Sequence, residues 1–347
     1  MICPLNASSQ RATSTASSQD FPDVSIAIVN FNSGPLLAQC LQAVAAQTHR
    51  AYEVVIVDNA SRDQSMLLAR DAVREDPRFT FRAIDTNLGF AAGNNLAARE
   101  ARGIWLVTLN PDAFPEPDWL ENLLSATRRH PEVEMFGSTQ IDAEDPLRLD
   151  GCGDVYMGYG FYWRGGQGRP RSELPPEGRT FSACGAAAMY KARKFLELGG
   201  FDEKFFCIGE DVDLGFRWRL AGGHAIQVRD AVVLHVGSAM MGRRSTFSRY
   251  HASRNMVWTF VKNMPPALFW PLLPIHVGLV IMRIAAALVR GDAVPVIRGI
   301  RDACCRLPEV WNARQRIQTA RIATTCAIAR AMCWSPYRTM RRLPHIW

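Results

Sequence analysis

Short apolar runs separated by polar turns recur along the first 140 positions of the chain. Such runs are typical of buried strands, and the stretches between them carry one apolar face, which is typical of helices. Because strands and helices alternate with short connections, the pattern predicts right-handed βαβ units and an α/β fold with a mostly parallel sheet, covered by helices on both faces. The runs predict strands at 24–30, 52–57, 79–84, 104–109 and 133–137.

The alternation ends near residue 138. Residues 142–178 are rich in Gly, Pro, Arg and aromatic side chains and predict a long irregular segment of the kind that is often functional. Its aromatic rings either stack on a sugar or lipid or pack on the sheet, and we favour packing. Order returns after it, with small residues at 181–190, a helix from 209 to about 222, short strands at 224–228 and 231–235, and a basic helix at 245–263.

The most apolar run of the chain is about 16 residues long, at 267–282, and contains Pro271, Pro274 and His276. A helix that crosses a membrane needs roughly 20 apolar residues. We therefore expect this segment to lie in a membrane interface, and the alternative is a buried helical hairpin of the soluble fold. Residues 291–347 predict basic amphipathic helices.

Charge is distributed unevenly along the 347 residues. The net charge is +7, and 17 Lys and Arg against three acidic residues give 240–347 about +14, which leaves the remainder at about −7. A basic end on an acidic body suggests an anionic partner, either membrane or nucleic acid. The nine cysteines have no repeated spacing, so we expect reduced thiols rather than a disulfide framework or zinc site. Residues 1–22 are expected to be a disordered leader, since they lack the apolar stretch of a secretory signal.

Polar clusters follow three of the predicted strands, at Asp58-Asn59, Asn87–Asn95 and Asn110–Asp112. The carboxyl ends of parallel strands lie at one edge of a sheet, where open α/β sheets bind ligands. Asp112 could hold a divalent cation there together with a diphosphate, or could merely begin the turn into the next helix. Asp58 could accept hydrogen bonds from a base or ribose. The chain contains neither GxGxxG nor GxxxxGK[ST], so the dinucleotide fingerprint and the P-loop do not apply.

Glu210 and Asp211 stand at the start of a predicted helix. Carboxylates at this position often only complement the helix dipole. The same dipole would also keep a carboxylate ionised, as a general base must be.

These residues carry a resemblance. The segments VSIAIVNFN, VIVDNAS, NLGFAAGNN, LNPDA, GGFDEKFF, GEDVDL and LHVGS occur in this order in the family 2 inverting glycosyltransferases, and the chain looks most like their bacterial rhamnosyltransferase branch over about residues 23–260. The resemblance implies a GT-A fold and a divalent cation, Mg or Mn. Asn110-Pro111-Asp112 stands where the family has its DxD motif; Asn110 departs from that motif, so Asp112 should make most of the metal contact.

The resemblance also implies roles for individual residues. Asp211 matches the expected base, with Glu210 as the fallback. His235 resembles a histidine that joins the metal or diphosphate site in relatives, and it could equally be structural. The nucleotide-sugar contacts are expected from Asn30, Asn32, Asp58, Asn59, Asn87, Gly89, Asn94 and Asn110. Arg243, Arg244 and Arg254 could neutralise the diphosphate, or could face solvent or lipid.

The expected organisation is a leader at 1–22, a glycosyltransferase domain at 23–260 and a basic, apolar, membrane-associating region at 261–347. The domain divides into a nucleotide-binding half at 23–138 and an acceptor and catalytic half at 139–260. We expect an inverting transferase that moves L-rhamnose from its thymidine diphosphate to a lipid-linked or cell-envelope glycan. Uridine diphosphate hexose or galactofuranose donors are the alternatives.

The basic, apolar end suits an anionic membrane surface, which predicts a cytoplasmic protein held peripherally at the inner face of the plasma membrane. No nucleic acid partner is expected, because the basic end lacks interleaved aromatic residues and a recognised nucleic-acid motif. Two further readings are a sugar-1-phosphate nucleotidyltransferase, for which a glycine-rich basic signature is missing, and a non-catalytic protein that binds nucleotide sugar or membrane.

Overall fold

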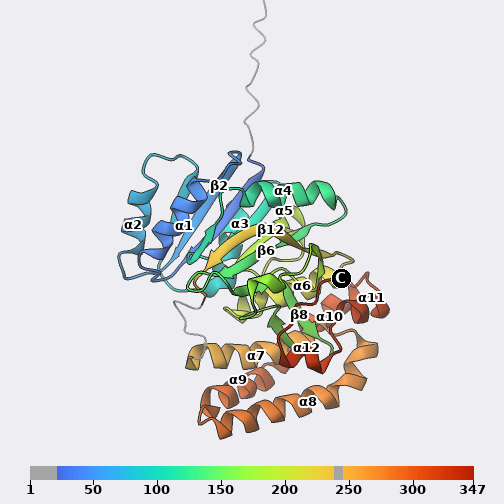
Figure 1. Cartoon of the computed structure of the whole chain (residues 1–347). Coiled ribbons are helices and arrows are strands. Elements are labelled where there is room, and N and C mark those ends of the chain that lie inside the picture. Colours follow the sequence, from blue (N-terminus) through green and yellow to red (C-terminus); the bar gives the residue numbers. More distant parts are fainter. Residues whose placement is uncertain (1–21, 238–244) are drawn as a thin grey trace, which may run out of the picture.

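A computed structural model describes residues 22–237 and 245–347 (Figure 1). One large sheet has the strand order β10-β12-β6-β11-β4-β1-β2-β3, with β5 paired to β12 and β7 paired to β6. Helices lie on both faces of it, as predicted. Its strands are β1 (Val24–Asn30), β2 (Tyr52–Asn59), β3 (Phe79–Ile84), β4 (Trp105–Leu109), β5 (Ala113–Pro115), β6 (Met135–Asp142), β7 (Leu149–Cys152), β10 (Gly178–Thr180), β11 (Ala187–Lys191) and β12 (Ala225–His235).

The predicted parallel half is present. β1 pairs in parallel with β2 and β4, and β2 pairs in parallel with β3, so their carboxyl ends share one rim of the sheet. β1 and β2 are buried along their whole length, which is why they read as continuous apolar runs. The helices of this half are α1 (Leu36–Ala45), α2 (Ser65–Ala72), α3 (Gly89–Glu100) and α4 (Trp119–Arg129).

Strand β11 runs against its neighbours. It pairs antiparallel with β4 on one side and with β6 on the other. Its amino-terminal end therefore lies at the rim where β1, β2 and β4 end. The sheet is mixed rather than parallel throughout, and β11 joins its two halves.

Two predictions for the middle of the chain were wrong in detail. The strands expected at 224–228 and 231–235 form one strand, β12, whose pairing with β6 is irregular between Val228 and Val232. Residues 142–178 are less irregular than expected. They contain β7 and a two-stranded sheet of β8 (Asp154–Met157) and β9 (Phe161–Arg164), followed by the short helix η1 (Arg171–Glu173) and β10.

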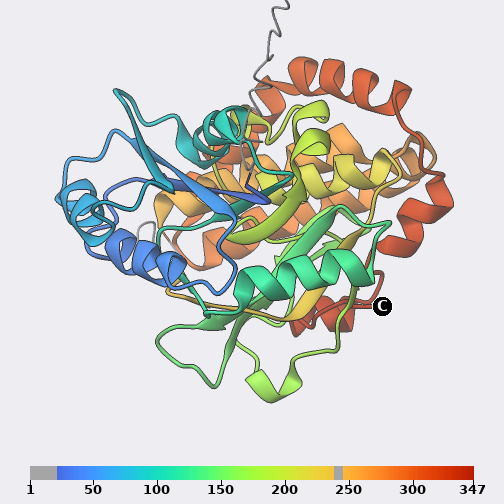
Figure 2. The same cartoon turned by 90° about the horizontal axis from the view of Figure 1, so that it is seen from above.

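Past β11 come α5 (Ala192–Glu197), the short helix η2 (Glu203–Phe205) and α6 (Glu210–Leu220). A helical layer then lies below the rim, and seen from above it underlies the sheet and extends past its edge (Figures 1 and 2). It consists of α7 (Thr246–Asn263), α8 (Pro266–Val289), α9 (Ala293–Cys305), α10 (Leu307–Thr319), α11 (Thr325–Ala331) and α12 (Pro336–Met340).

Helix α8 is longer than the apolar run suggested. It has 24 residues, and its length and composition would allow it to cross a membrane. The helix extends past the apolar run at 267–282, through Arg283 to Val289. Pro271 and Pro274 lie inside the helix on its exposed side, where water can satisfy the carbonyl groups that they leave unbonded.

Candidate active site

The first polar cluster of the rim joins the ends of β1 and β2. Asn30 Nδ2 donates hydrogen bonds to Asp58 Oδ1 at 2.9 Å and to Ser61 Oγ at 3.0 Å. Asn32 has a positive φ of 50°, and its side-chain oxygen accepts a hydrogen bond from the Arg62 amide at 2.7 Å. The predicted residues Asn30 and Asp58 therefore lie side by side, buried at the ends of β1 and β2, and Asn32 lies in the loop that follows β1.

The second cluster joins the end of β2 to the start of α3. Asn59 Nδ2 donates to Asn87 Oδ1 at 2.8 Å and to the Gly89 carbonyl at 3.2 Å. Gly89 has a φ of 85°, and a Cβ there would lie 2.6 Å from the Phe206 carbonyl oxygen, so this position requires glycine. Asn94 is buried one turn further along α3 and donates to the Phe90 carbonyl at 2.9 Å.

The third cluster brings Asp112 and His235 together, as the sequence predicted. His235 Nε2 lies 3.3 Å from Asp112 Oδ1 and 3.2 Å from Asn110 Nδ2. On the other side of the ring, His235 Nδ1 lies 2.6 Å from Asp150 Oδ2. Arg164 donates to the same Asp150 oxygen. Sequence reasoning missed Asp150 and Arg164, which stand in the segment expected to be irregular.

This cluster fits a divalent cation. With Nδ1–H directed at Asp150, the lone pair of His235 Nε2 points toward Asp112, which is the carboxylate–histidine arrangement that supports metal ligands. Asp112 Oδ1 is buried and makes no hydrogen bond of good geometry within the described residues. Burial alone would raise the pKa of Asp112, but the His235 ring, whose Nε2 lies 3.3 Å from Asp112 Oδ1, holds that pKa below its usual value. An ionised oxygen and an imidazole nitrogen are ligands that Mn²⁺ accepts.

Asp211 lies at the first turn of α6, facing the amino-terminal end of β11. Its Oδ2 accepts a hydrogen bond from the Gly185 amide at 2.9 Å, and its Oδ1 accepts one from the Val212 amide at 2.8 Å. A Cβ at Gly185 would lie 3.3 Å from Asp211 Cβ, so the two residues are in close contact. Two backbone amides therefore fix the orientation of this carboxylate.

Glu210 differs from Asp211 in its surroundings. Its side chain is buried, and Oε2 has no hydrogen-bond partner within the described residues. Burial and the neighbouring charge of Asp211 raise the pKa of Glu210 well above its ordinary value. A raised pKa favours the protonated form of this carboxyl group, which makes it less suited to accept a proton.

Asp154 and Cys184 lie beside Asp211, with one ligand atom of each of the three residues within 4.8 Å of the others. Burial and the charge of Asp211 raise the pKa of Asp154 well above its ordinary value. No motif marked these two residues in the sequence, because Asp154 stands alone in an aromatic strand and Cys184 in a run of small residues.

Only one of the three predicted arginines, Arg254, lies in the part of the chain that the structure describes. Arg254 is buried on α7, where it donates to the Phe205 carbonyl at 2.8 Å and stacks over Trp258. These contacts give it a structural part, and its diphosphate role stays a prediction. Arg243 and Arg244 lie outside the described residues.

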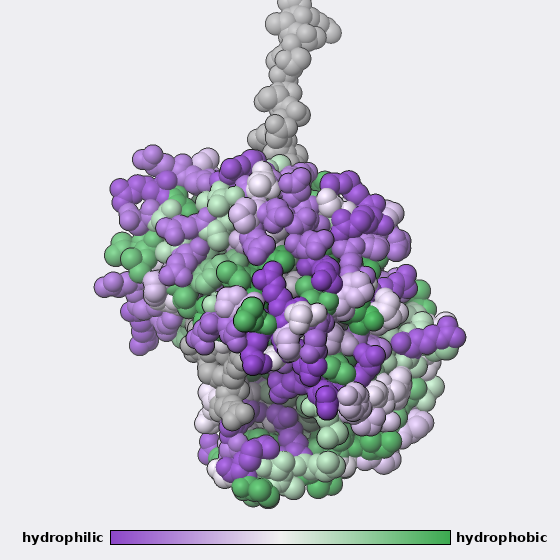
Figure 3. All heavy atoms as spheres, in the orientation of Figure 1, coloured by the Kyte–Doolittle hydropathy of each residue, from purple (hydrophilic) through white to green (hydrophobic). Residues whose placement is uncertain are grey.

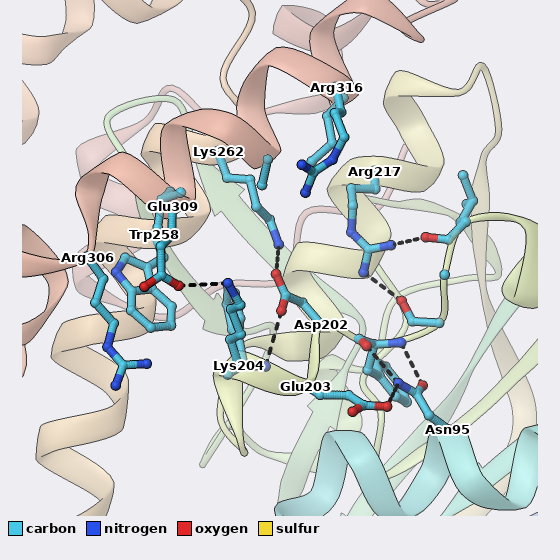
Figure 4. Close-up of a pocket in the computed structure, with 18 residues that line it drawn as sticks. Asn95, Asp202, Glu203, Lys204, Arg217, Trp258, Lys262, Arg306, Glu309 and Arg316 are labelled. Atoms are coloured by element: carbon cyan, nitrogen blue, oxygen red, sulfur yellow. Dashed lines mark hydrogen bonds and ion pairs between the residues drawn. The ribbon is translucent and has the colours of Figure 1, made fainter.

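A separate pocket of about 370 Å³ opens between η2, α6 and α10 (Figure 4). It is lined mainly by charged side chains that pair with one another. Lys262 bridges Asp202 and Asp213, and Lys204 pairs with Glu309 across the opening. None of the predicted site residues lines it.

Comparison with known proteins decides the family. Residues 25–198 match the model of glycosyl transferase family 2. The chain belongs to this family. The predicted enzyme class, a glycosyltransferase, is confirmed by this match and by the relatives that follow.

Two relatives come from bacterial envelope polysaccharide synthesis. The O-antigen biosynthesis protein RfbC of Myxococcus xanthus is 33% identical over 63% of this chain, which spans only 18% of that larger protein. The N-acetylglucosaminyl-diphospho-decaprenol L-rhamnosyltransferase of Mycobacterium tuberculosis is 27% identical over 66% of this chain and 81% of its own. The predicted likeness to rhamnosyltransferases is confirmed.

Solved structures confirm the GT-A fold. A mannosyltransferase from Pyrobaculum calidifontis, in complex with GDP-Man and Mn²⁺, covers 90% of this chain with a TM-score of 0.53 and 22% identity. GalNAc-T7 with UDP, GalNAc and Mn²⁺ covers 68% with a TM-score of 0.55 and 16% identity.

Proposed function

We propose that the protein is an inverting, metal-dependent glycosyltransferase that moves a sugar from a nucleoside diphosphate to a hydroxyl of a lipid-linked or cell-envelope glycan. The observation that carries the proposal is the meeting of three parts at one rim: the Asn30–Asp58 cluster, the Asp112–His235 pair and the amide-held carboxylate of Asp211. Each part matches one requirement of the reaction. The nucleotide base must be recognised, the charge of the diphosphate must be neutralised, and the acceptor hydroxyl must lose its proton.

The donor would lie along the carboxyl ends of β1, β2 and β4. Asp58 and Asn59 would accept and donate hydrogen bonds to the base and ribose, supported by Asn30, Asn32 and Asn87. Gly89 and Asn94 would border the donor sugar at the start of α3. Asp112 and His235 would hold Mg²⁺ or Mn²⁺, and we favour Mn²⁺ because both solved relatives described above contain it. The bound cation would neutralise charge on the leaving diphosphate.

Asp211 would act as the general base. The acceptor hydroxyl gives its proton to an Asp211 oxygen while its own oxygen forms a bond to the anomeric carbon of the donor sugar. The bond from that carbon to the diphosphate breaks with its electron pair, and the nucleoside diphosphate leaves. Attack from the side opposite the diphosphate inverts the configuration. The two backbone amides that donate to Asp211 hold its carboxylate in a fixed orientation before the reaction.

We further propose L-rhamnose from thymidine diphosphate rhamnose as the donor sugar and a polyprenyl-diphosphate sugar as the acceptor. Support comes from the M. tuberculosis relative, whose name states both an L-rhamnosyl transfer and a diphospho-decaprenol acceptor. Such an acceptor places the protein in the cytoplasm, peripherally at the inner face of the plasma membrane. Uridine diphosphate hexose and galactofuranose remain the competing donors.

The first experiment is donor hydrolysis by the purified chain with Mn²⁺ or Mg²⁺. Release of nucleoside diphosphate is measured across thymidine and uridine diphosphate sugars. Metal-dependent release from thymidine diphosphate rhamnose alone is the expected result, and release from a uridine diphosphate sugar alone would replace the donor assignment. Pyrophosphate as the product would instead indicate a nucleotidyltransferase.

The second experiment compares two adjacent carboxylates. Asp211→Asn should bind the donor as well as the wild type and lose transfer by roughly 10²–10⁴-fold. Glu210→Gln keeps the shape of a buried side chain whose pKa is raised and whose Oε2 has no hydrogen-bond partner within the described residues, so it should lose far less. If Glu210→Gln abolishes transfer while Asp211→Asn keeps it, the base assignment moves to Glu210.

A further inference from the structure

Helix α8 presents two opposite faces, and one of them is attached to the rest of the protein. His276 stacks on Phe260 of α7 with ring centroids 4.0 Å apart, and its Nδ1 lies 3.0 Å from the Tyr159 carbonyl oxygen. Arg283, two turns later, donates to Ser253 Oγ at 3.0 Å. Phe269 and Ala287 are buried on the same side. Spacings of seven, seven and four residues keep these four positions on one stripe of the helix.

The opposite face is apolar and exposed. It carries Trp270, Ile275, Val277, Ile281, Met282 and Leu288, which are 45–65% exposed. Val294 and Ile297 of α9 are exposed as well, at 60% and 43%. Figure 3 shows green and pale residues over this lower end of the molecule. An exposed apolar surface of this extent marks an interaction site.

The attached face argues against a membrane-spanning helix. If α8 crossed a bilayer, His276 and Arg283 would leave their partners on the transferase domain and enter hydrocarbon, which is costly for an arginine. With both contacts kept, the axis of α8 lies along the surface of the domain for about 36 Å. Only the exposed face is then free to enter lipid.

Charge indicates what covers this face. Arg290, Arg298 and Arg301 are exposed beside it, and residues 245–347 contain 15 Lys and Arg against three acidic residues. Anionic lipid head groups complement such a surface. A second copy of the chain docked on the same face would bring like charges together, which disfavours a dimer.

The active-site rim of the sheet lies on the same side of the molecule as the exposed apolar face of α8 and α9. Gly89 at the rim contacts Phe206, which stacks on His251 of α7 with ring centroids 5.5 Å apart, and the layer formed by α7, α8 and α9 continues below them (Figure 1). We infer that the exposed face of α8 and α9 docks in the plane of an anionic membrane and turns the active-site rim toward the lipid surface. The inference deepens the membrane association proposed above, because a lipid-linked acceptor would then reach Asp211 from the membrane side.

The test uses the full chain at low salt, together with vesicles of phosphatidylcholine that contain either no phosphatidylglycerol or about 30 mol% of it. Co-sedimentation should be strong with the anionic vesicles and weak with the neutral ones. Ile281→Glu should reduce partitioning at least tenfold, because it removes one inserted side chain and adds a negative charge. Leu67→Glu, at an exposed apolar position of α2, is the matched control and should bind like the wild type. Arg298→Gln should weaken binding roughly fivefold.

Two results would overturn the inference. One is equal vesicle binding by Ile281→Glu and Leu67→Glu. The other is wild-type protein that stays with the membrane after alkaline carbonate extraction, which would indicate a spanning helix. Soluble-donor hydrolysis by Ile281→Glu is measured in parallel and should equal the wild-type rate. Lost binding with kept hydrolysis supports the docking face, whereas absent hydrolysis in all variants and the wild type would contradict the proposed function instead.

Discussion

Lys262 offers a sharp test of how the helical layer is held to the transferase domain. Its side chain is only 3% exposed, and Nζ lies 2.6 Å from Asp202 Oδ2 and 2.8 Å from Asp213 Oδ1 (Figure 4). Asp213 has no exposed side-chain surface and also pairs with Arg217 at 2.9 Å. Lys262 therefore joins α7 to the turn before η2 and to α6, two residues beyond Asp211.

Replacing Lys262 with Met keeps most of the side-chain volume and removes the charge. Removing one partner of a buried ion pair typically costs about 3–5 kcal/mol, because the other partner stays buried and unpaired. Arg217 still compensates Asp213, so Asp202 carries most of this penalty. Burial raises the pKa of Asp202, and the charge and hydrogen bond of Lys262 outweigh it and lower that pKa in the wild type. Because the Asp202 side chain is 26% exposed and Asp213 keeps Arg217, we expect Lys262→Met to lose less than this, about 2–3 kcal/mol of unfolding free energy at pH 7.

The matched control is Lys204→Met in the same pocket. Lys204 pairs with Glu309 at 2.7 Å, but the two side chains are 58% and 51% exposed. An exposed pair contributes about 0–1 kcal/mol, so this variant should unfold close to the wild type. The assay is urea unfolding followed by circular dichroism.

The pH dependence of the unfolding free energy provides a second measurement. Without Lys262, the folded pKa of Asp202 should be higher than in the wild type, so the stability deficit of the variant should shrink as the pH falls from 7 toward 4. The reasoning is refuted if Lys262→Met loses no more stability than Lys204→Met, or if its deficit stays constant over that pH range.

Three further outcomes are expected. Asp150→Asn should weaken Mn²⁺ binding about 10–100-fold in calorimetry, because it removes the carboxylate behind His235. Asp145→Asn, at a half-exposed position away from His235, should not weaken it, and equal affinities of the two variants would contradict the metal assignment. Gly185→Ala should lower kcat roughly tenfold or more with donor binding kept, because the new methyl group displaces Asp211; an unchanged kcat would show that the carboxylate tolerates movement. Burial and the charge of Arg254 lower the pKa of His251 to about 4, below its unfolded value of about 6.5. The stability that the neutral His251 contributes is therefore present above about pH 6.5 and is lost as the pH falls toward about 4. Unfolding curves at pH 7 and pH 5 should show a smaller acid loss for His251→Phe than for the wild type.

The nucleotide-binding half could be predicted because local pattern and tertiary position agree there. Each buried parallel strand is a continuous apolar run, and each run ends at polar residues, as at Asp58 and Asp112. Register in a parallel sheet then brings those residues to one rim without further information. The parallel register of β1 and β2 sets Asn30 opposite Asp58, whereas the antiparallel pairing of β12 with β5 sets His235 opposite Ala113, next to Asp112.

The remaining site residues could not be predicted because they depend on contacts far apart in the chain. Asp150 reaches His235 across 85 positions and stands in a segment without a period. The pair Arg229-Asp230 suggested a turn, yet both residues are exposed on a continuous strand where its pairing is irregular. The apolar run at 267–282 is shorter than α8, because Arg283 interrupts it before the helix ends at Val289.

The antiparallel course of β11 has a consequence for how this protein can diverge. Main-chain atoms next to that strand connect the two halves of the site. On the donor side, the Asn110 amide donates to the Ala186 carbonyl, and Thr108 Oγ1 donates to the Gly185 carbonyl. On the other side, the Gly185 amide donates to Asp211. The distance between the donor-binding residues and Asp211 is therefore set by main-chain contacts and depends little on side-chain identity. Substitutions in the surrounding loops can alter which acceptor fits while the distance over which the sugar travels stays the same.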